Sequence, residues 1–312
     1  MGIEMQYGAN SDQLIFEAWD YGIIGRENDE RCAIASDFIR ENTAKIITFK
    51  YHPKEFKVQI DGIIVDKDDV NDELKHFNGH RVILDATSLD FAELLILLQS
   101  FKDLNKNMFS IIYIEPSEYN QNKGIKEILR MREFELCDES VGLEAIPGHS
   151  LTITNDVVQK VVFLCGFESE RIDRALEDTQ IHGTECCVVF GVPAFSPGWE
   201  MHSFTNNLTV MKDRRITGGV NYCGATDPFS VYNKLLYIYK GLEDDWEMFI
   251  APFATKPMNI GACLFLVLMP KTKVAALYDH PQEKLGKGLG IGNWHLFNID
   301  YNTLTREADW HN

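Results

Sequence analysis

A lysine at the start of an expected helix is the residue whose setting most favours binding chemistry. Lys256 follows Thr255, which suits a helix N-cap, and precedes Pro257, which a helix accepts in its first turn. The preceding residues 249–254 are apolar and predict a buried strand. Free N–H groups, the helix dipole and an ammonium would converge there and favour a phosphate or another anion. The simpler alternative is a capped helix beside a surface lysine.

Carboxylates and hydroxyls form a second set of candidates. They follow two expected strands of the first half of the chain and comprise Asp85, Thr87, Ser88, Glu115 and Tyr119. Asp85, Glu115 or, in the second half, Glu168 could activate water against a phosphoester or glycosidic bond. Neither a histidine nor a metal-ligand set accompanies these carboxylates in the sequence, and Ser88 or Thr87 could equally cap a helix while Asp85 holds the turn.

Buried strands, polar turns and helices alternate in both halves of the chain. This order predicts an α/β fold with two tandem Rossmann-like domains, each with a mostly parallel sheet flanked by helices. We expect an N-terminal domain over residues 1–150 and a C-terminal domain over residues 151–312. Residues 294–299 are expected as a last strand at the edge of the second sheet, and the glycine-rich residues 286–292 as a linker.

Several further residues are expected at the same rim as Lys256, because ligands gather at the carboxyl ends of parallel strands. Gly166 would allow a tight turn after the first strand of the second half. The rim residues expected beside it are Glu168, Ser169, Arg171 and Asp279. Trp199 ends a loop rich in proline and aromatic residues, and it either covers the rim or is buried between helices.

Composition limits the possible partners. The formal net charge of -17 argues against duplex nucleic acid and anionic membranes as partners, although a small anion in a basic pocket stays possible. No apolar run approaches the roughly 20 residues of a membrane span and no signal peptide is apparent, so we expect a cytoplasmic protein. Of the 7 cysteines, several lie in apolar runs and should be buried thiols, and neither a metal nor a cofactor is expected.

Residues 251–258, Ala-Pro-Phe-Ala-Thr-Lys-Pro-Met, resemble the signature turn of CRISPR-associated Rossmann-fold (CARF) sensor domains. The resemblance covers residues from about 158 to 280, and Phe253-Ala254 stands where that family prefers glycines. It implies that Thr255, Lys256 and Met258 contact a nucleotide, with residues 166–169 as the opposing wall. It further implies a regulatory protein, such as a sensor of a prokaryotic anti-phage defence system, that acts through a partner or by forming a homo-oligomer.

Three functions therefore stay open. The first is a module that binds a nucleotide or another phosphate-bearing molecule, which the lack of a recognisable nucleophile–base pair or metal set favours. The second is a hydrolase that uses Asp85, Glu115 or Glu168. The third is a scaffold for protein contacts.

Overall fold

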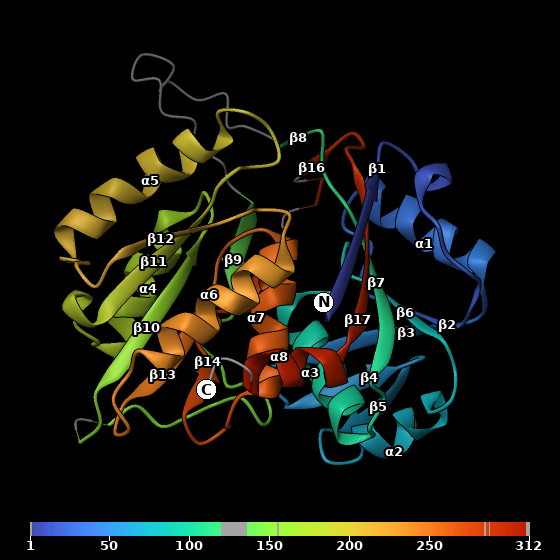
Figure 1. Ribbon diagram of the computed structural model, residues 1–312, viewed down its shortest axis with the longest axis horizontal. Helices are drawn as coiled ribbons and strands as arrows, with labels where there is room; N and C mark the ends of the chain where they lie inside the picture. Colours follow the sequence, from blue (N-terminus) through green and yellow to red (C-terminus); the bar gives the residue numbers. More distant parts are fainter. Residues whose placement is uncertain (1, 120–135, 155, 284, 287, 310–312) are drawn as a thin grey trace. The chain divides into compact units, whose positions relative to one another are not determined.

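The chain forms two compact units, and the computed structural model describes residues 2–119, 136–154, 156–283, 285–286 and 288–309 (Figure 1). Unit 1 comprises residues 1–119 and 285–312, and unit 2 comprises residues 120–284. The α/β class is as predicted, with sheets flanked by helices. The division differs from the one expected near residue 150, because the end of the chain returns to the first sheet instead of completing the second.

Unit 1 contains an 8-stranded sheet with the order β1-β17-β7-β6-β2-β3-β4-β5. Its strands are β1 (Ile3–Gly8), β2 (Trp19–Ile24), β3 (Thr43–His52), β4 (Lys57–Ile60), β5 (Ile63–Asp66), β6 (Val82–Asp85), β7 (Met108–Ile114) and β17 (Trp294–Asp300). The four strands β7, β6, β2 and β3 run parallel, while β1, β17, β4 and β5 join antiparallel. The sheet is therefore mixed, with a parallel centre.

The strand expected at residues 294–299 exists, but its predicted place was wrong. β17 lies inside the sheet of unit 1, between β1 and β7, and is antiparallel to both. Its successive residues Leu296 and Phe297 are both 0% exposed. Because successive side chains of a strand point to opposite faces, such a strand needs cover on both faces and suits an interior position better than an edge.

Helices cover both faces of this sheet, and side-chain caps begin α1 and α3. They are α1 (Glu30–Asn42), α2 (Val70–Leu74), α3 (Phe91–Asp103) and α8 (Tyr301–Asp309). α1 buries Ala35, Phe38 and Ile39 against strand residues such as Ile112. α3 begins with a capping box in which Asp90 and Glu93 bond each other's backbone N–H groups, so Asp90, and neither Thr87 nor Ser88, is the cap.

Unit 2 contains a 5-stranded, fully parallel sheet with the order β12-β11-β10-β13-β14. Its elements in chain order are β10 (Gln159–Cys165), α4 (Ser169–Thr179), β11 (Cys186–Gly191), α5 (Trp199–Asp213), β12 (Val220–Cys223), α6 (Pro228–Lys240), β13 (Glu247–Pro252), α7 (Lys256–Leu268) and β14 (Val274–Ala276). This is the Rossmann-like arrangement that the sequence predicts for this part of the chain.

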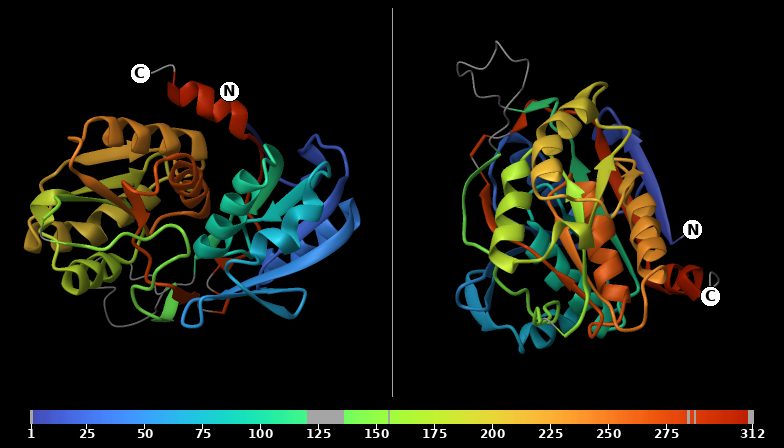
Figure 2. Two further views of the ribbon diagram at one scale, coloured as in Figure 1. Left: turned by 90° about the horizontal axis from the view of Figure 1, so that it is seen from below. Right: turned by 90° about the vertical axis from the view of Figure 1, so that its left-hand side faces the viewer.

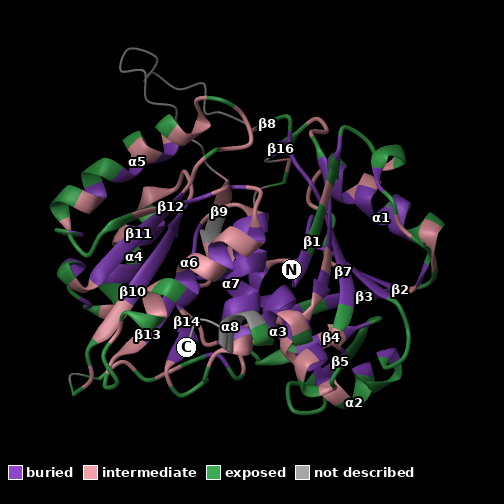
Figure 3. Ribbon diagram, in the orientation of Figure 1, coloured by how far each residue is buried: buried purple, intermediate pink, exposed green. Residues whose placement is uncertain are grey.

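The helices of unit 2 lie in two layers. α4 and α5 cover one face of the sheet, and α6 and α7 cover the other (Figure 2). α7 is buried from Pro257 to Val267, as its mostly apolar sequence predicts, and Asn259 is the polar residue within this stretch (Figure 3). Neighbouring strands β10 and β13 therefore send their chains to opposite faces. A crevice outside the carboxyl ends of two such strands is the usual ligand position in this kind of sheet.

Short strand pairs complete both units. β8 (Glu118–Tyr119) pairs with β16 (Gly288–Leu289) in unit 1, and β9 (Cys137–Ser140) pairs with β15 (Pro281–Glu283) in unit 2. Every helix among the described residues falls short of the length and apolarity that crossing a bilayer requires.

Candidate functional site

The loops that follow β10 and β13 touch at the carboxyl edge of the parallel sheet. A Cβ atom on Gly166 would lie 2.2 Å from the carbonyl oxygen of Phe253, so no residue with a side chain fits without a backbone shift. The predicted glycine requirement at residue 166 thus comes from this close approach. It brings the loop that leads into α4 into contact with the loop that leads into α7.

The predicted N-cap of α7 is confirmed. The Thr255 hydroxyl accepts a hydrogen bond from the N–H of Met258 (3.4 Å) and donates to the carbonyl of Ala225 (2.6 Å). The N–H of Asn259 donates to the Thr255 carbonyl at 2.9 Å, and Pro257 has no N–H. Most donors of this first turn are therefore used internally, contrary to expectation, so an anion here would depend on the half-buried Lys256 and on the helix dipole.

The start of α4 supplies the backbone donors that α7 lacks. Within the part of the chain that the structure describes, no acceptor meets the N–H groups of Ser169 and Glu170, the first residues of α4. Side chains of α5 hold the carbonyls of the preceding loop: Ser203 (2.8 Å) and Asn207 (2.9 Å) donate to Gly166, and Asn206 (3.0 Å) donates to Phe167. In a trans peptide the N–H points opposite to the C=O of the preceding residue. The N–H groups of Phe167 and Glu168 therefore point away from α5.

Three predicted rim residues bind one another. The Arg171 guanidinium forms a two-point ion pair with Asp279, with Nε–Oδ2 at 3.0 Å and Nη2–Oδ1 at 2.5 Å, and lies over the Phe253 ring at 4.2 Å. Glu168 accepts from the N–H groups of Leu136 (2.9 Å) and Cys137 (3.1 Å) and lies 3.9 Å from Arg171. Arg171 and Asp279 are both buried, so this cluster braces the edge of the sheet instead of offering open contacts.

Electrostatics keep the Arg171 guanidinium ionised. Burial acts to lower the pKa of Arg171, but the Asp279 carboxylate outweighs it and holds the pKa of Arg171 above its ordinary value. The guanidinium therefore stays charged at every physiological pH.

The two remaining predicted contacts, Trp199 and Met258, differ in their surroundings. Trp199 is half-buried at the start of α5, and its ring meets the ring of Phe167 edge-on at 6.1 Å. It thus borders the loop between β10 and α4. Met258 is 0% exposed, and its sulfur lies 3.1 Å from the Cβ position of Gly191, so this side chain belongs to the core and offers no surface to a ligand.

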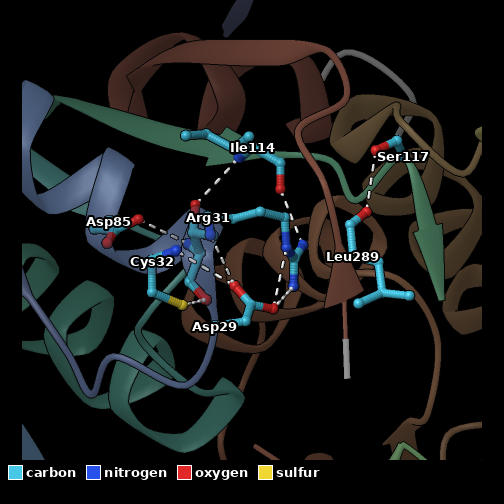
Figure 4. A network of polar contacts seen from close by, with 8 residues as sticks. Asp29, Arg31, Cys32, Asp85, Ile114, Ser117 and Leu289 are labelled. Atoms are coloured by element: carbon cyan, nitrogen blue, oxygen red, sulfur yellow. Dashed lines mark hydrogen bonds and ion pairs between the residues drawn. The ribbon is translucent and has the colours of Figure 1, made fainter. Parts of the chain in front are cut away.

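In unit 1, Asp85 holds a buried turn (Figure 4). Its carboxylate accepts the N–H of Thr87 at 2.9 Å and the hydroxyl of Ser88 at 2.5 Å. The same two side chains receive backbone N–H groups from neighbouring strand ends, Ile114 on Thr87 (3.1 Å) and Gly25 on Ser88 (2.8 Å). Asp85 is 0% exposed. Its two hydrogen bonds stabilise the turn, as the structural alternative in the sequence analysis proposes.

Glu115 has a histidine partner that the sequence did not indicate. Its Oε1 lies 2.7 Å from Nε2 of His295, and its Oε2 accepts from Asn293 at 3.1 Å. The prediction that no histidine accompanies the carboxylates was therefore wrong. The two residues are 180 positions apart and meet only because β17 pairs with β7, so no local spacing could reveal them.

Arg31 is a buried charged residue that the sequence analysis did not single out. It is 4% exposed, pairs with Asp29 (Nη2–Oδ2, 2.5 Å) and donates to the carbonyl of Ile114 at 3.1 Å (Figure 4). Burial opposes its charge, yet Tyr113 and Asp29 hold the pKa of Arg31 above its ordinary value. A Cβ on Gly288 would lie 2.8 Å from this guanidinium, so the supposed glycine linker is packed against unit 1 at this point.

The buried thiols match the prediction. Cys165, Cys186, Cys187 and Cys263 are all buried, and burial raises the pKa of Cys187 to about 11. Among the described residues, no group of three or more His, Cys, Asp or Glu side chains is arranged to hold a metal ion.

Surface cavities lie elsewhere in the described part of the chain. One of about 540 Å³ is lined by Lys160, α6 residues and Trp246 in unit 2, and one of about 490 Å³ lies in unit 1 between Glu4, Trp19 and Asn298. Neither is lined by a residue that the sequence predicts as a contact. Compared with protein-family models and with curated proteins, the sequence matches none.

Proposed function

We propose that unit 2 is a binding module for a phosphate-bearing molecule, at the crevice where the loops after β10 and β13 meet. The observation that supports it best is the close approach of Gly166 to the backbone of Phe253, because these two residues lie in the loops that lead into α4 and α7. Two helix N-termini that face one position combine two favourable dipole ends with one ammonium, that of Lys256.

The roles of the contacts differ within this site. The N–H groups of Ser169 and Glu170 would donate to phosphate oxygens, and Lys256 would add a charge-assisted contact. Thr255 holds the turn through its bond to Ala225. Arg171 and Asp279 act behind the site as a brace, and Trp199 beside Phe167 would bound the ligand on the side of α5.

A nucleotide is the ligand class that we propose, since the Thr255–Met258 turn resembles the CARF signature. The whole chain would then be a sensor, such as one in a prokaryotic defence system, that passes on the bound state through a protein partner or by self-assembly. A hydrolase remains the second candidate, and the hydrogen bond between Glu115 and His295 is the observation in its favour. A scaffold role would require no ligand at all.

The test compares Lys256→Ala with the wild type and with Lys212→Ala, which removes the same charge from the exposed face of α5. Each protein is titrated calorimetrically with mononucleotides, dinucleotides and cyclic oligonucleotides, and each is melted thermally. Loss of a charge-assisted contact should weaken binding by about tenfold to a hundredfold, equivalent to about 1.5–3 kcal/mol. Both variants should stay folded in the melt, with the smaller change in melting temperature for the exposed Lys212, so a loss of binding by Lys256→Ala is read on folded protein.

The outcomes separate the candidates. Weaker binding by Lys256→Ala alone supports the site, whereas equal weakening by both variants would mean that only the overall charge matters. If the folded wild type binds no member of the panel, residues 255–257 serve only as a helix cap and the binding proposal is wrong. Ligand cleavage during the titration would favour the hydrolase.

A further inference from the structure

One face of the sheet in unit 1 changes from apolar to polar along its length. β17 and β7 pair so that Trp294 faces Ile114, Leu296 faces Ile112 and Asn298 faces Ser110. The first two of these cross-strand pairs belong to the core beneath α1. The third pair is polar, and β1 extends it by one residue, since Glu4 is opposite Asn298. Directly opposed residues share a face, so Glu4, Asn298 and Ser110 form a polar row.

This polar row opens into the 490 Å³ cavity of unit 1, a volume within the usual range for small-molecule sites. Besides the three residues of the row, its lining includes Phe16, Trp19 and the pair Glu17 and Arg81. Phe16 stacks on Trp19 with ring centres 4.9 Å apart, so aromatic rings flank the row.

Hydrogen bonds along the row run in one direction. The Trp19 indole donates to the Ser110 hydroxyl (3.0 Å), which donates to the side-chain oxygen Oδ1 of Asn298 (2.8 Å), and Nδ2 of the same Asn298 side chain donates to Glu4 (3.3 Å). The direction is fixed at both ends, because an indole N–H can only donate and a carboxylate can only accept. The last donor of the row therefore bonds to Oε2 of Glu4. The other oxygen of this exposed carboxylate, Oε1, remains as an acceptor.

Charge at the mouth of the cavity is negative. Arg81 forms an ion pair with Glu17 and also donates to the Glu17 carbonyl at 2.6 Å, so these two charges offset each other. Glu4 is the remaining charged residue of the lining. The net charge of -17 also draws cations toward the protein.

From this geometry we propose that the cavity binds an alkylammonium ion of polyamine size. The ammonium pairs with Glu4, and the alkyl chain lies against Phe16. Aromatic faces beside a carboxylate are the usual surroundings of bound organic cations. This site is independent of the phosphate site proposed for unit 2, and it lies wholly within unit 1.

The test is a calorimetric titration of the full chain with spermidine, for the wild type, Glu4→Gln and Glu41→Gln. Glu4→Gln keeps the shape of the side chain and removes the charge, and Glu41→Gln makes the same change of net charge on the exposed surface of α1. We expect saturable binding to the wild type, about tenfold weaker binding to Glu4→Gln, and binding to Glu41→Gln within about twofold of the wild type.

Equal weakening by both variants would overturn the proposal, because it would show that spermidine responds only to net charge. Absence of saturable binding to the folded wild type would overturn it as well. A thermal melt of each variant shows that it is folded, and Glu4 is exposed, so its substitution should leave the melt unchanged.

Discussion

The buried ion pair between Arg171 and Asp279 gives the sharpest stability prediction. Replacing Arg171 by Met keeps a long side chain against the Phe253 ring but leaves the Asp279 carboxylate, 7% exposed, without its cation. Breaking a buried pair from one side costs about 3–5 kcal/mol, a large share of a total stability of about 5–15 kcal/mol. Arg171→Met should therefore unfold at much lower urea concentration than the wild type.

A double-mutant cycle separates the pair from its surroundings. Arg171→Met combined with Asp279→Leu replaces both charges by apolar groups, and such replacements are often neutral, so the double variant should recover most of the lost stability. Urea unfolding followed by circular dichroism measures all four proteins. If Arg171→Met costs less than about 1 kcal/mol, the pair behaves like an exposed one and the assigned brace is wrong.

Two other predictions concern unit 2. Gly166→Ala places its Cβ 2.2 Å from the Phe253 oxygen and should cost about 1–3 kcal/mol in urea unfolding, whereas Gly241→Ala, with 3.4 Å to its nearest neighbour, should not. Burial, with help from Lys271, lowers the pKa of His149 from 6.5 to about 3. As the pH falls, the unfolded chain binds this proton before the folded chain does. The free energy of unfolding should therefore fall between pH 6.5 and 3 by up to about 1.4 kcal/mol per pH unit, and it should depend less on pH in His149→Phe.

Local signals in the sequence predicted much of the secondary structure. β7 begins at Met108 and ends at Ile114, as its apolar run indicates, and α7 follows directly after the Thr255 cap. These features depend on residues that are neighbours in the chain. The parallel sheet of unit 2 was predictable for the same reason, since each strand is followed at once by its helix.

Pairings between segments that are far apart in the chain could not be predicted from the sequence. Nothing near residue 294 shows that β17 enters the first sheet, so neither the unit boundary nor the contact of His295 with Glu115 could be inferred. At the candidate site, the sequence placed Arg171 and Asp279 at one rim but did not show that the two side chains pair with each other. Their 108-residue separation hid this pairing.

The two units share a feature that only the structure reveals. A Cβ on Gly25, after β2, would lie 2.5 Å from the carbonyl oxygen of Ser88, after β6. Gly166 makes the equivalent approach to Phe253 in unit 2. In both units, a glycine thus lets two neighbouring loops touch where adjacent parallel strands end, although in unit 1 the polar groups of the Ser88 turn are already hydrogen-bonded.

The central claim is the position of the anion site, and backbone-amide NMR tests it most directly. The isotope-labelled chain would be titrated with inorganic phosphate and then with the tightest nucleotide of the panel, with Lys256→Ala as the comparison. We predict that the largest shifts fall on the amides of Ser169, Glu170 and Lys256, and that they shrink in the variant. Shifts confined to other parts of the chain, or equal shifts in both proteins, would contradict the proposed site.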